Sequence, residues 1–339
     1  LDIPGKAIDE DAVEKQEELL GEEHDEGEEE EFENTDGFIA NTDTDVDAIT
    51  GGGSFHFGDK GFVGLSISYL DNEYGIPPGA HGHHEHEEEH GEEEHEEGEH
   101  EDEEEELIRI DMEQTRYDGM LHLHDLAPGI EVLRGFLTYT DYEHKELEGS
   151  EVGTRFDRDT WEGRLEAVHG DFLGAHGVFG LQWRADEFSA QGEEAYIPET
   201  DSTEWGLFLI EDFHHGDWTY ELGLRGDYVD RDPDAETTGS EDFTSFSVSG
   251  SALWNFAQDW RAGLSLSRSE RAPAAEELFS NVDAQDEDEL VTHAATGVIE
   301  IGSPDLDEEV SFNADLSLGW QGEVSWAELT LFYNQFEDY

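Results

Sequence analysis

Apolar and polar residues alternate along most of the chain, and this period of two limits the possible folds more than any other feature of the sequence. From about residue 48 onward, successive stretches rich in Phe, Tyr, Trp, Leu and Val carry polar residues at every second position. The alternation predicts strands with one apolar and one wet face, as in half-buried antiparallel sheets. The residues predicted to share the apolar, outer face are Tyr220, Leu222, Leu224, Phe312, Leu316 and Leu318.

The connections between these stretches alternate strictly in length. We expect about twelve strands of roughly 11 to 18 residues, longer than the strands of soluble sheets. Short turns are predicted near Asp59–Lys60, Leu126–Gly129, Asp171–Gly174, Gly216–Asp217, Gln258–Asp259 and Gln321–Gly322. Long loops are predicted at 71–106, 147–158, 191–202, 232–242 and 273–309. Short turns at one end and long loops at the other are typical of an outer-membrane β-barrel.

Tryptophan placement agrees with a membrane barrel. Several tryptophans lie within a few residues of a short turn, where an aromatic girdle at the periplasmic interface is expected. They are Trp218, Trp254, Trp260, Trp320 and Trp326. The alternative is a soluble sandwich with the tryptophans in its core. The strand lengths and the asymmetry of the loops argue against that alternative.

The charge of the chain excludes one class of partner. The 339 residues carry a formal net charge of -75, so polyanionic nucleic acid is repelled and no nucleic acid partner is expected. Two stretches, 9–33 and 85–106, hold much of this charge and are predicted to be loops or disordered segments. Cysteine is absent, so neither a disulfide framework nor a thiolate metal site is available.

The beginning of the chain does not resemble a secretion signal. Residues 1–15 lack a basic region followed by an apolar one, and no apolar run approaches the ~18 residues of a membrane helix. On this ground alone the protein is either cytosolic or a mature or truncated piece.

Several motifs resemble a known family. The stretches 265–281 (SLSRSERAPAAEELFSN), 293–318 and 331–339 closely resemble the barrel of TonB-dependent outer-membrane receptors. Within that family, 69–90, 109–118, 140–157 and 192–198 are similar to the subgroup associated with zinc uptake. The resemblance implies an all-β fold, a transmembrane antiparallel barrel of the plugged, roughly 22-stranded class. It also implies location in the bacterial outer membrane, contact with outer-membrane lipid, and no enzymatic activity.

The chain departs from the family pattern in ways that predict a fragment. It shows no TonB box, no N-terminal plug domain and only about twelve strands, and it stops at Tyr339. We therefore expect an acidic extracellular loop at 1–47 and an incomplete barrel at 48–339, with a His/Glu-rich loop at 79–106. Coupling to the TonB energy-transducing complex would pass through the missing plug.

The His/Glu-rich stretch is the main candidate metal site. It holds seven of the chain's seventeen histidines, which exceeds what solubility alone requires. Imidazole suits zinc, copper and nickel, and the surrounding carboxylates raise the local cation concentration. The predicted ligands are His81, His83, His84, His86, His90, His95 and His100. We expect weak, multi-site capture of a metal ion, in contrast to the alternative of a solvated acidic loop without metal affinity.

A protease reading of the same stretch is weaker. His86 to His90 satisfies the H-E-x-x-H pattern of zinc proteases. In a tract of His, Glu and Gly, however, this spacing arises by chance, and no apolar face exists to dock a helix. No catalytic residue is predicted.

Further ligands are predicted on other long loops. Glu193 and Glu194 lie in one, and His293 lies in another, both on the side where substrate would enter. His214 and His215 are left out because they flank a short turn at the opposite end. Arg268 and Arg271 are interpreted as lumen-facing charges that pair with carboxylates across the wall.

Zinc, or another divalent transition metal, is thus expected as the transported ligand, with no cofactor required. Two alternatives remain open at this stage. A siderophore or haem receptor of the same fold would use aromatic and basic loop residues, whereas these loops are acidic. A non-transporting acidic surface barrel that buffers cations is the second.

Overall fold

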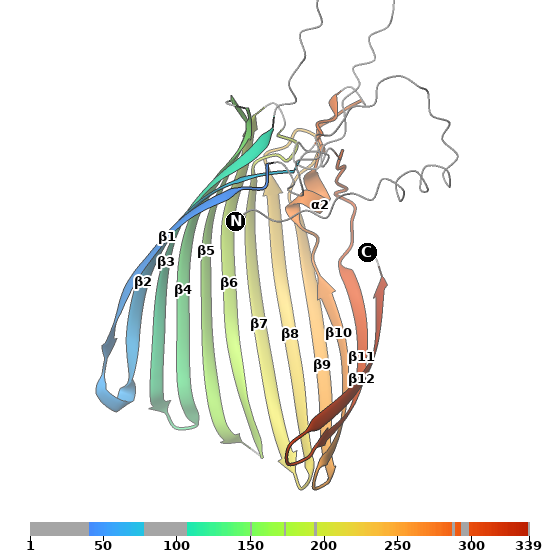
Figure 1. The fold of residues 1–339 in the computed structure, drawn as a ribbon. Coiled ribbons are helices and arrows are strands. Elements are labelled where there is room, and N and C mark those ends of the chain that lie inside the picture. Colours follow the sequence, from blue (N-terminus) through green and yellow to red (C-terminus); the bar gives the residue numbers. More distant parts are fainter. Residues whose placement is uncertain are drawn as a thin grey trace, which may run out of the picture.

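A computed structural model describes residues 41–77, 107–149, 151–172, 174–192, 195–286, 289–292 and 298–337. These residues form one antiparallel sheet of twelve strands in which neighbours in sequence are neighbours in space (Figure 1). The strands are β1 (Thr44–His56), β2 (Gly61–Gly75), β3 (Ile108–Ala127), β4 (Ile130–Glu148), β5 (Glu151–Phe172), β6 (Ala175–Gly192), β7 (Thr200–His215), β8 (Trp218–Pro233), β9 (Glu241–Ala257), β10 (Trp260–Arg271), β11 (Glu309–Gln321) and β12 (Trp326–Glu337). Two short helices accompany them, η1 (Gly58–Lys60) and α2 (Ala275–Phe279).

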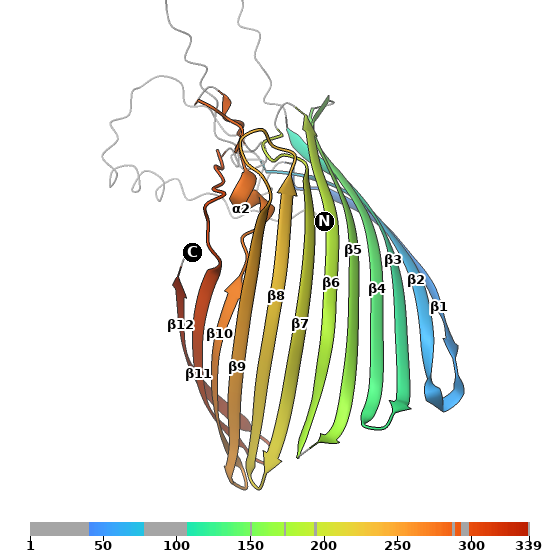
Figure 2. The same ribbon diagram turned by 180° about the vertical axis from the view of Figure 1, so that it is seen from behind.

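The sheet is a meander that does not close. The two edges in the described part of the chain are β1 and β12 (Figure 2). All six predicted short turns are present, and they gather at one end of the sheet (Figure 1). β1 begins at Thr44, four residues before the predicted start of the barrel at residue 48.

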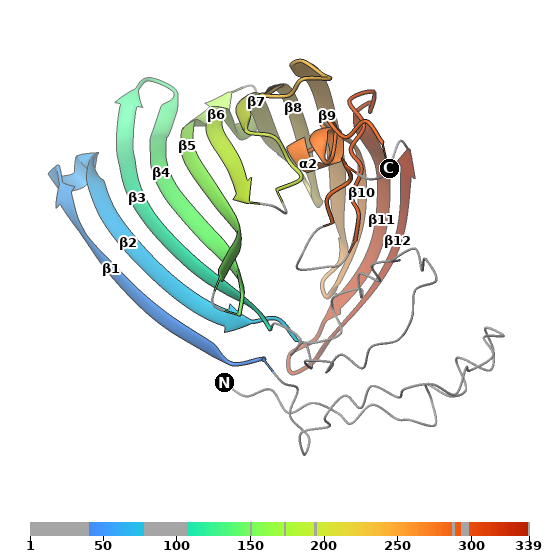
Figure 3. The ribbon, with the colours of Figure 1, turned by 90° about the horizontal axis from the view of Figure 1, so that it is seen from above.

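The two faces of the sheet are distinguished by what covers them. Seen from above, the strands curve into an open arc with α2 on the concave side (Figure 3). Leu278 and Phe279 of α2 are fully buried against Val229 of β8 and Phe243 of β9. Because side chains alternate across a strand, these contacts identify the inner face of every strand through the cross-strand register.

The outer face is apolar, as predicted. Leu222 lies opposite Gly250 and Leu264 lies opposite Leu316, so the outward rows run across neighbouring strands. The six predicted outward side chains are all exposed: Tyr220, Leu222, Leu224, Phe312, Leu316 and Leu318. An exposed apolar face on such a scale suits a lipid environment and not water.

Two aromatic rows bound this apolar band. At the short-turn end lie Trp218, Trp254, Trp260 and Trp320, and the Trp218 and Trp254 rings stack with centroids 5.1 Å apart. The predicted fifth member, Trp326, is opposite Gln321 in the register and faces the other side. The row at the far end consists of Tyr117, Tyr139, Trp161, Trp183, Trp205 and Tyr228.

The spacing of the rows matches a membrane. On β8, ten residues separate Trp218 from Tyr228. At about 3.3 Å per residue and a tilt of about 40°, they stand about 25 Å apart along the membrane normal, the height of the apolar band in outer-membrane barrels.

One predicted loop is wrong. Residues 147–158 were expected to form a long connection, but β4 continues to Glu148 and β5 starts at Glu151. Beyond the upper aromatic row the outer face is charged, whereas the inner face mixes polar and aromatic side chains such as Thr154 and Phe156, so the period-two signal disappears although backbone pairing continues. Ion pairs across the outer surface replace apolar contacts there, joining Glu143 to Lys145 (2.7 Å) and to Arg155.

No described helix has the length and apolar character needed to cross a bilayer.

Candidate functional site

The predicted metal ligands all fall outside the described residues. This applies to the seven histidines from His81 to His100 and to Glu193, Glu194 and His293. Among the residues that the structure does describe, no group of three or more His, Asp or Glu side chains is arranged to hold a metal ion. The described part of the site is therefore the inner face of the sheet and the connections folded over it.

Arginine–carboxylate pairs line the inner face. Asp186 is buried and accepts hydrogen bonds from Nε and Nη2 of Arg158 at 3.0 and 2.9 Å, while Nε of Arg184 lies 3.2 Å away. The other inner pairs are Arg116–Asp118, Arg134–Glu166, Arg164–Glu166, Arg225–Asp227, Arg231–Glu204 and Arg261–Glu328. The inner wall thus presents hydrogen-bonding groups of both signs with little net charge.

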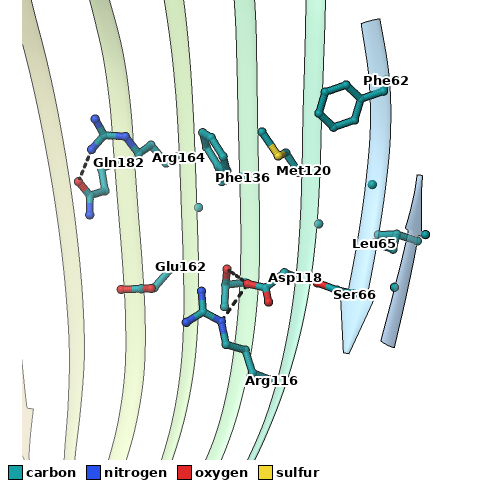
Figure 4. Close-up of a pocket in the computed structure, with 16 residues that line it drawn as sticks. Phe62, Leu65, Ser66, Arg116, Asp118, Met120, Phe136, Glu162, Arg164 and Gln182 are labelled. Carbon is teal, nitrogen blue, oxygen red and sulfur yellow. Dashed lines mark hydrogen bonds and ion pairs between the residues drawn. The ribbon is translucent and has the colours of Figure 1, made fainter. Parts of the chain in front are cut away.

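A cavity of about 520 Å³ lies against β1 to β6 on this inner wall (Figure 4). Arg116 donates to Asp118 at 2.9 Å, and Thr138 donates to the same carboxylate at 3.0 Å. Nearer the short turns Arg164 donates to Gln182 at 3.1 Å. The rest of the lining includes the apolar side chains of Phe62, Met120 and Phe136 besides the polar Ser66 and Glu162, so the pocket combines fixed polar groups with a hydrophobic surface.

A second cavity of about 550 Å³ lies under α2 at the long-connection end. Its floor is formed by side chains of β4, β5 and β6, and its roof by Tyr196, Ile197 and Glu276. Burial raises the pKa of Tyr196 to about 12, so its hydroxyl keeps its proton and can donate a hydrogen bond. The side chains of the floor include Tyr142, His144, Phe156, Arg158, Arg184 and Phe188.

One short segment joins three of the long connections. The backbone N–H of Asn281 donates to the carbonyl of Tyr196 at 2.6 Å, and its side-chain amide donates to the carbonyls of Val291 and Glu300. Asp283 accepts hydrogen bonds from the backbone N–H groups of residues 236 and 237. The segment 281–283 therefore holds the connections after β6, β8 and β10 together over the mouth of the arc.

Arg271 anchors the base of this arrangement. Its guanidinium donates to Glu277 of α2 at 2.8 and 3.0 Å and to Glu309 of β11 at 2.9 Å. Arg271 faces inward as predicted, but Arg268 does not. Arg268 is opposite Phe312 in the register and its guanidinium lies 5.6 Å from that ring, on the outer face. The two arginines are three positions apart, so they occupy opposite faces of one strand.

The sequence did not lead us to predict the arginine–carboxylate pairs of the inner face, although it contains a pattern that indicates them. Four of them have the form R-x-D or R-x-E on one strand, at 116–118, 164–166, 184–186 and 225–227. A spacing of two places both charges on the same face of a strand. The same spacing at 155–157 and 268–270 lies on the outer face, so the motif predicts the pair but not the face.

Comparison with known proteins gives one family. The profile described as "TonB dependent receptor-like, beta-barrel" matches residues 33–339.

Solved structures with the same fold include three receptors. The FrpB iron transporter from Neisseria meningitidis superimposes with a TM-score of 0.65 at 12% identity, over 89% of this chain and 46% of its own. The copper transporter OprC gives 0.63 at 13%, over 87% and 46%. The hemophore receptor HasR from Serratia marcescens, solved with its hemophore and heme, gives 0.65 at 14%, over 90% and 47%. At these identities the likeness shows the fold, and the chain spans a little under half the length of the structures it matches.

Proposed function

The chain belongs to the TonB-dependent receptor β-barrel family of outer-membrane proteins, and from this premise we propose that it takes part in the TonB-dependent uptake of a metal ion, namely zinc. The metal is first captured by the histidines between 81 and 100. It then passes to ligands closer to the lumen, for which we propose Glu193, Glu194 and His293. Uptake through this route requires energy from the TonB complex, which acts through a plug domain.

The observation that carries the proposal is the position of the His/Glu-rich stretch in the sequence. It connects β2, which ends at Gly75, with β3, which begins at Ile108. Both strand ends lie at the long-connection end of the sheet, and in outer-membrane barrels this end faces the outside of the cell. A stretch rich in imidazole and carboxylate at that end meets dissolved cations before they reach the lumen.

Ligand chemistry supports a transition metal such as zinc over the alkaline-earth ions. Neutral imidazole binds zinc, copper and nickel more readily than calcium or magnesium, which prefer all-oxygen sites. Glu193 and Glu194 flank the connection that carries Tyr196, and His293 belongs to the connection that Asn281 holds. Asn281 therefore links a described residue of each connection, Tyr196 in one and Val291 in the other.

A second candidate is an anionic metal chelate. It is favoured by the cavity under α2, where Arg158 and Arg184 lie among Tyr142, Phe156 and Phe188. Arginine and aromatic side chains suit a carboxylate-bearing or aromatic ligand. The two arginines already share the buried Asp186, which lowers the positive charge they can offer such a ligand.

The test is metal accumulation in cells that produce the intact receptor. We expect the receptor to raise zinc content under zinc limitation, and we expect a variant with His81 to His100 changed to glutamine to lose most of that gain. A variant with an equal number of glutamates from 9–33 changed to glutamine serves as control, since it removes acidity but no imidazole. Equal zinc accumulation by the histidine variant and the control contradicts the proposal. Uptake of a ferric chelate without zinc uptake favours the second candidate.

A further inference from the structure

Histidines in the described part of the chain gather at the short-turn end of the sheet. The structure describes His56, His122, His124, His144, His169, His176, His214 and His215. Of these, only His144 lies toward the long-connection end, and the other seven lie near the strand ends joined by short turns. In an outer-membrane barrel that end faces the periplasm.

Five of the seven side chains belong to the inner face. His56 is opposite Phe62, Phe62 is opposite His122, and His122 is opposite Arg134, whose partner Glu166 is part of the inner row. His124 shares the face of His122 because it is two residues further along the strand. On the other side of the arc His176 is opposite Asp212, and His214 lies two residues beyond Asp212. His169 and His215 are on the outer face.

The closest pair is His122 and His124. Their ring centroids are 4.6 Å apart. Two imidazoles bound to one tetrahedral zinc at about 2.0–2.1 Å have centroids roughly 5 Å apart, so the observed spacing is close to that of two rings that share one ion. The His122 ring is held by stacking on Phe62, with centroids 5.6 Å apart and planes 8° from parallel.

A second pair, formed by a histidine and a carboxylate, lies on β7. Nδ1 of His214 lies 3.2 Å from a carboxylate oxygen of Asp212, and His176 faces the same aspartate from β6. His124, His176 and His214 are all exposed to the lumen. Arg134 is opposite His122 in the register, and its positive charge opposes cation binding there. Its guanidinium lies 3.5 Å from Glu166, which partly neutralises that charge.

We propose that the inner rim at the periplasmic end binds a divalent transition metal cation, with His122 and His124 as the principal ligand pair and Asp212 with His214 as a second pair. The inference rests on the proposed function, because it assigns these residues to the exit of the transported metal. Each pair supplies only two ligands and leaves the rest of the coordination sphere to water. Binding is therefore weak and rapidly reversible, as a transit site requires, and unlike a structural zinc site with four protein ligands.

The experiment distinguishes metal binding at this rim from metal binding by the His/Glu-rich stretch. The intact receptor is purified in detergent with the seven histidines from His81 to His100 already changed to glutamine, so capture by that stretch cannot mask other sites. Zinc binding is measured by calorimetry, and Cu²⁺ bound in the same place is examined by electron paramagnetic resonance, which reports coordinating nitrogen. We expect remaining zinc binding with a nitrogen signature. The further change of His122→Gln with His124→Gln should weaken it by at least about tenfold, since losing even supporting residues of a metal site costs this much.

The matched control is His215→Gln, the same chemical change at the same end but on the outer face. It should leave zinc affinity unchanged. Unaltered binding in the His122/His124 variant, or no binding before that change is made, overturns the proposal. Failure of the proposed function would appear separately, as zinc uptake by cells that does not depend on His81 to His100.

A second measurement does not depend on the folding of variants. In the intact receptor, zinc should slow the modification of His122 and His124 by diethyl pyrocarbonate, read by mass spectrometry, while His215 reacts at its original rate. Equal rates with and without zinc at all three positions refute the site.

Discussion

Replacing the buried Asp186 should cost more stability than any other conservative change on the inner wall. Its side chain is 2% exposed and lies against the guanidinium groups of Arg158 and Arg184. Removing one partner of a buried ion pair costs about 3–5 kcal/mol. The two arginines are 39% and 31% exposed and can recover some hydration, and asparagine keeps one acceptor. We therefore expect Asp186→Asn to lower the free energy of unfolding by about 2–3 kcal/mol.

The outer surface offers a control residue, Asp201, whose replacement should change the stability in the opposite direction. Asp201 of β7 is exposed. It lies opposite Glu187 on β6 and opposite Asp232 on β8. Like charges directly opposite across strands destabilise a sheet by about 0.2–1 kcal/mol per pair, so Asp201→Asn should be neutral or stabilising. Its effect should disappear near 1 M salt, where the screening length is about 3 Å, whereas the loss at Asp186 should persist because that carboxylate is buried.

Both variants are compared by urea unfolding of the intact receptor in detergent micelles, followed by tryptophan fluorescence at low and high salt. Mobility in unheated gel samples checks that each variant has folded. If Asp186→Asn and Asp201→Asn shift the midpoint in the same direction and by similar amounts, the distinction between paired inner and unpaired outer carboxylates is wrong.

Three further outcomes are expected. Hydrogen bonds from Arg271 lower the pKa of Glu277 below its ordinary 4.5, although burial acts in the opposite direction. The contact therefore stabilises the mouth above that pH, and the stabilisation is lost as pH falls through the lowered pKa. Proteolysis of the connection after β10 should increase below about pH 4, and Glu277→Gln should abolish this pH dependence. A peptide covering 79–106 should bind zinc less tightly as pH falls through about 6.5, while its calcium binding should stay level until about pH 4, and calorimetry that shows both metals weakening together would refute imidazole capture. The 339-residue chain alone, with β1 and β12 unpaired at the sheet edges, should aggregate without detergent, and a monodisperse, folded species in plain buffer would contradict this.

The fold was predictable because successive residues of a membrane-spanning strand face lipid and the lumen in turn. Wherever one face of a strand meets lipid, apolar side chains recur every second position, and the twelve strands, their order and the six short turns follow from that pattern. The signal disappeared at 147–158, where β4 and β5 extend past the upper aromatic row and neither face meets lipid. In that region, ion pairs such as Lys145–Glu143 lie on the outer face and the His144 ring stacks on Phe156 on the inner face, so neither face leaves a hydrophobic period of two.

The site was less predictable for two physical reasons. The proposed ligands Glu193 and His293 belong to connections, where no periodicity relates one residue to another, so the sequence indicates candidate residues but not their neighbours. The inner wall depends on the face of each strand, and an R-x-D spacing fits either face. Arg268 illustrates this: only its register opposite Phe312 shows that it points outward, whereas Arg271, three residues away, points into the lumen.

The excess of negative charge is ordered by the same two-residue period. On the outer face above the upper aromatic row, Asp141, Asp159, Glu187, Asp201 and Asp232 lie opposite one another across five neighbouring strands. On the inner face, the carboxylates at the corresponding depth lie beside arginines, as Asp186 does. The difference follows from the surroundings of each face. The lumen offers less water to solvate unpaired charge, so its carboxylates need cationic partners. The outer surface beyond the membrane is in contact with electrolyte, where mobile cations can screen a row of like charges without any dedicated partner.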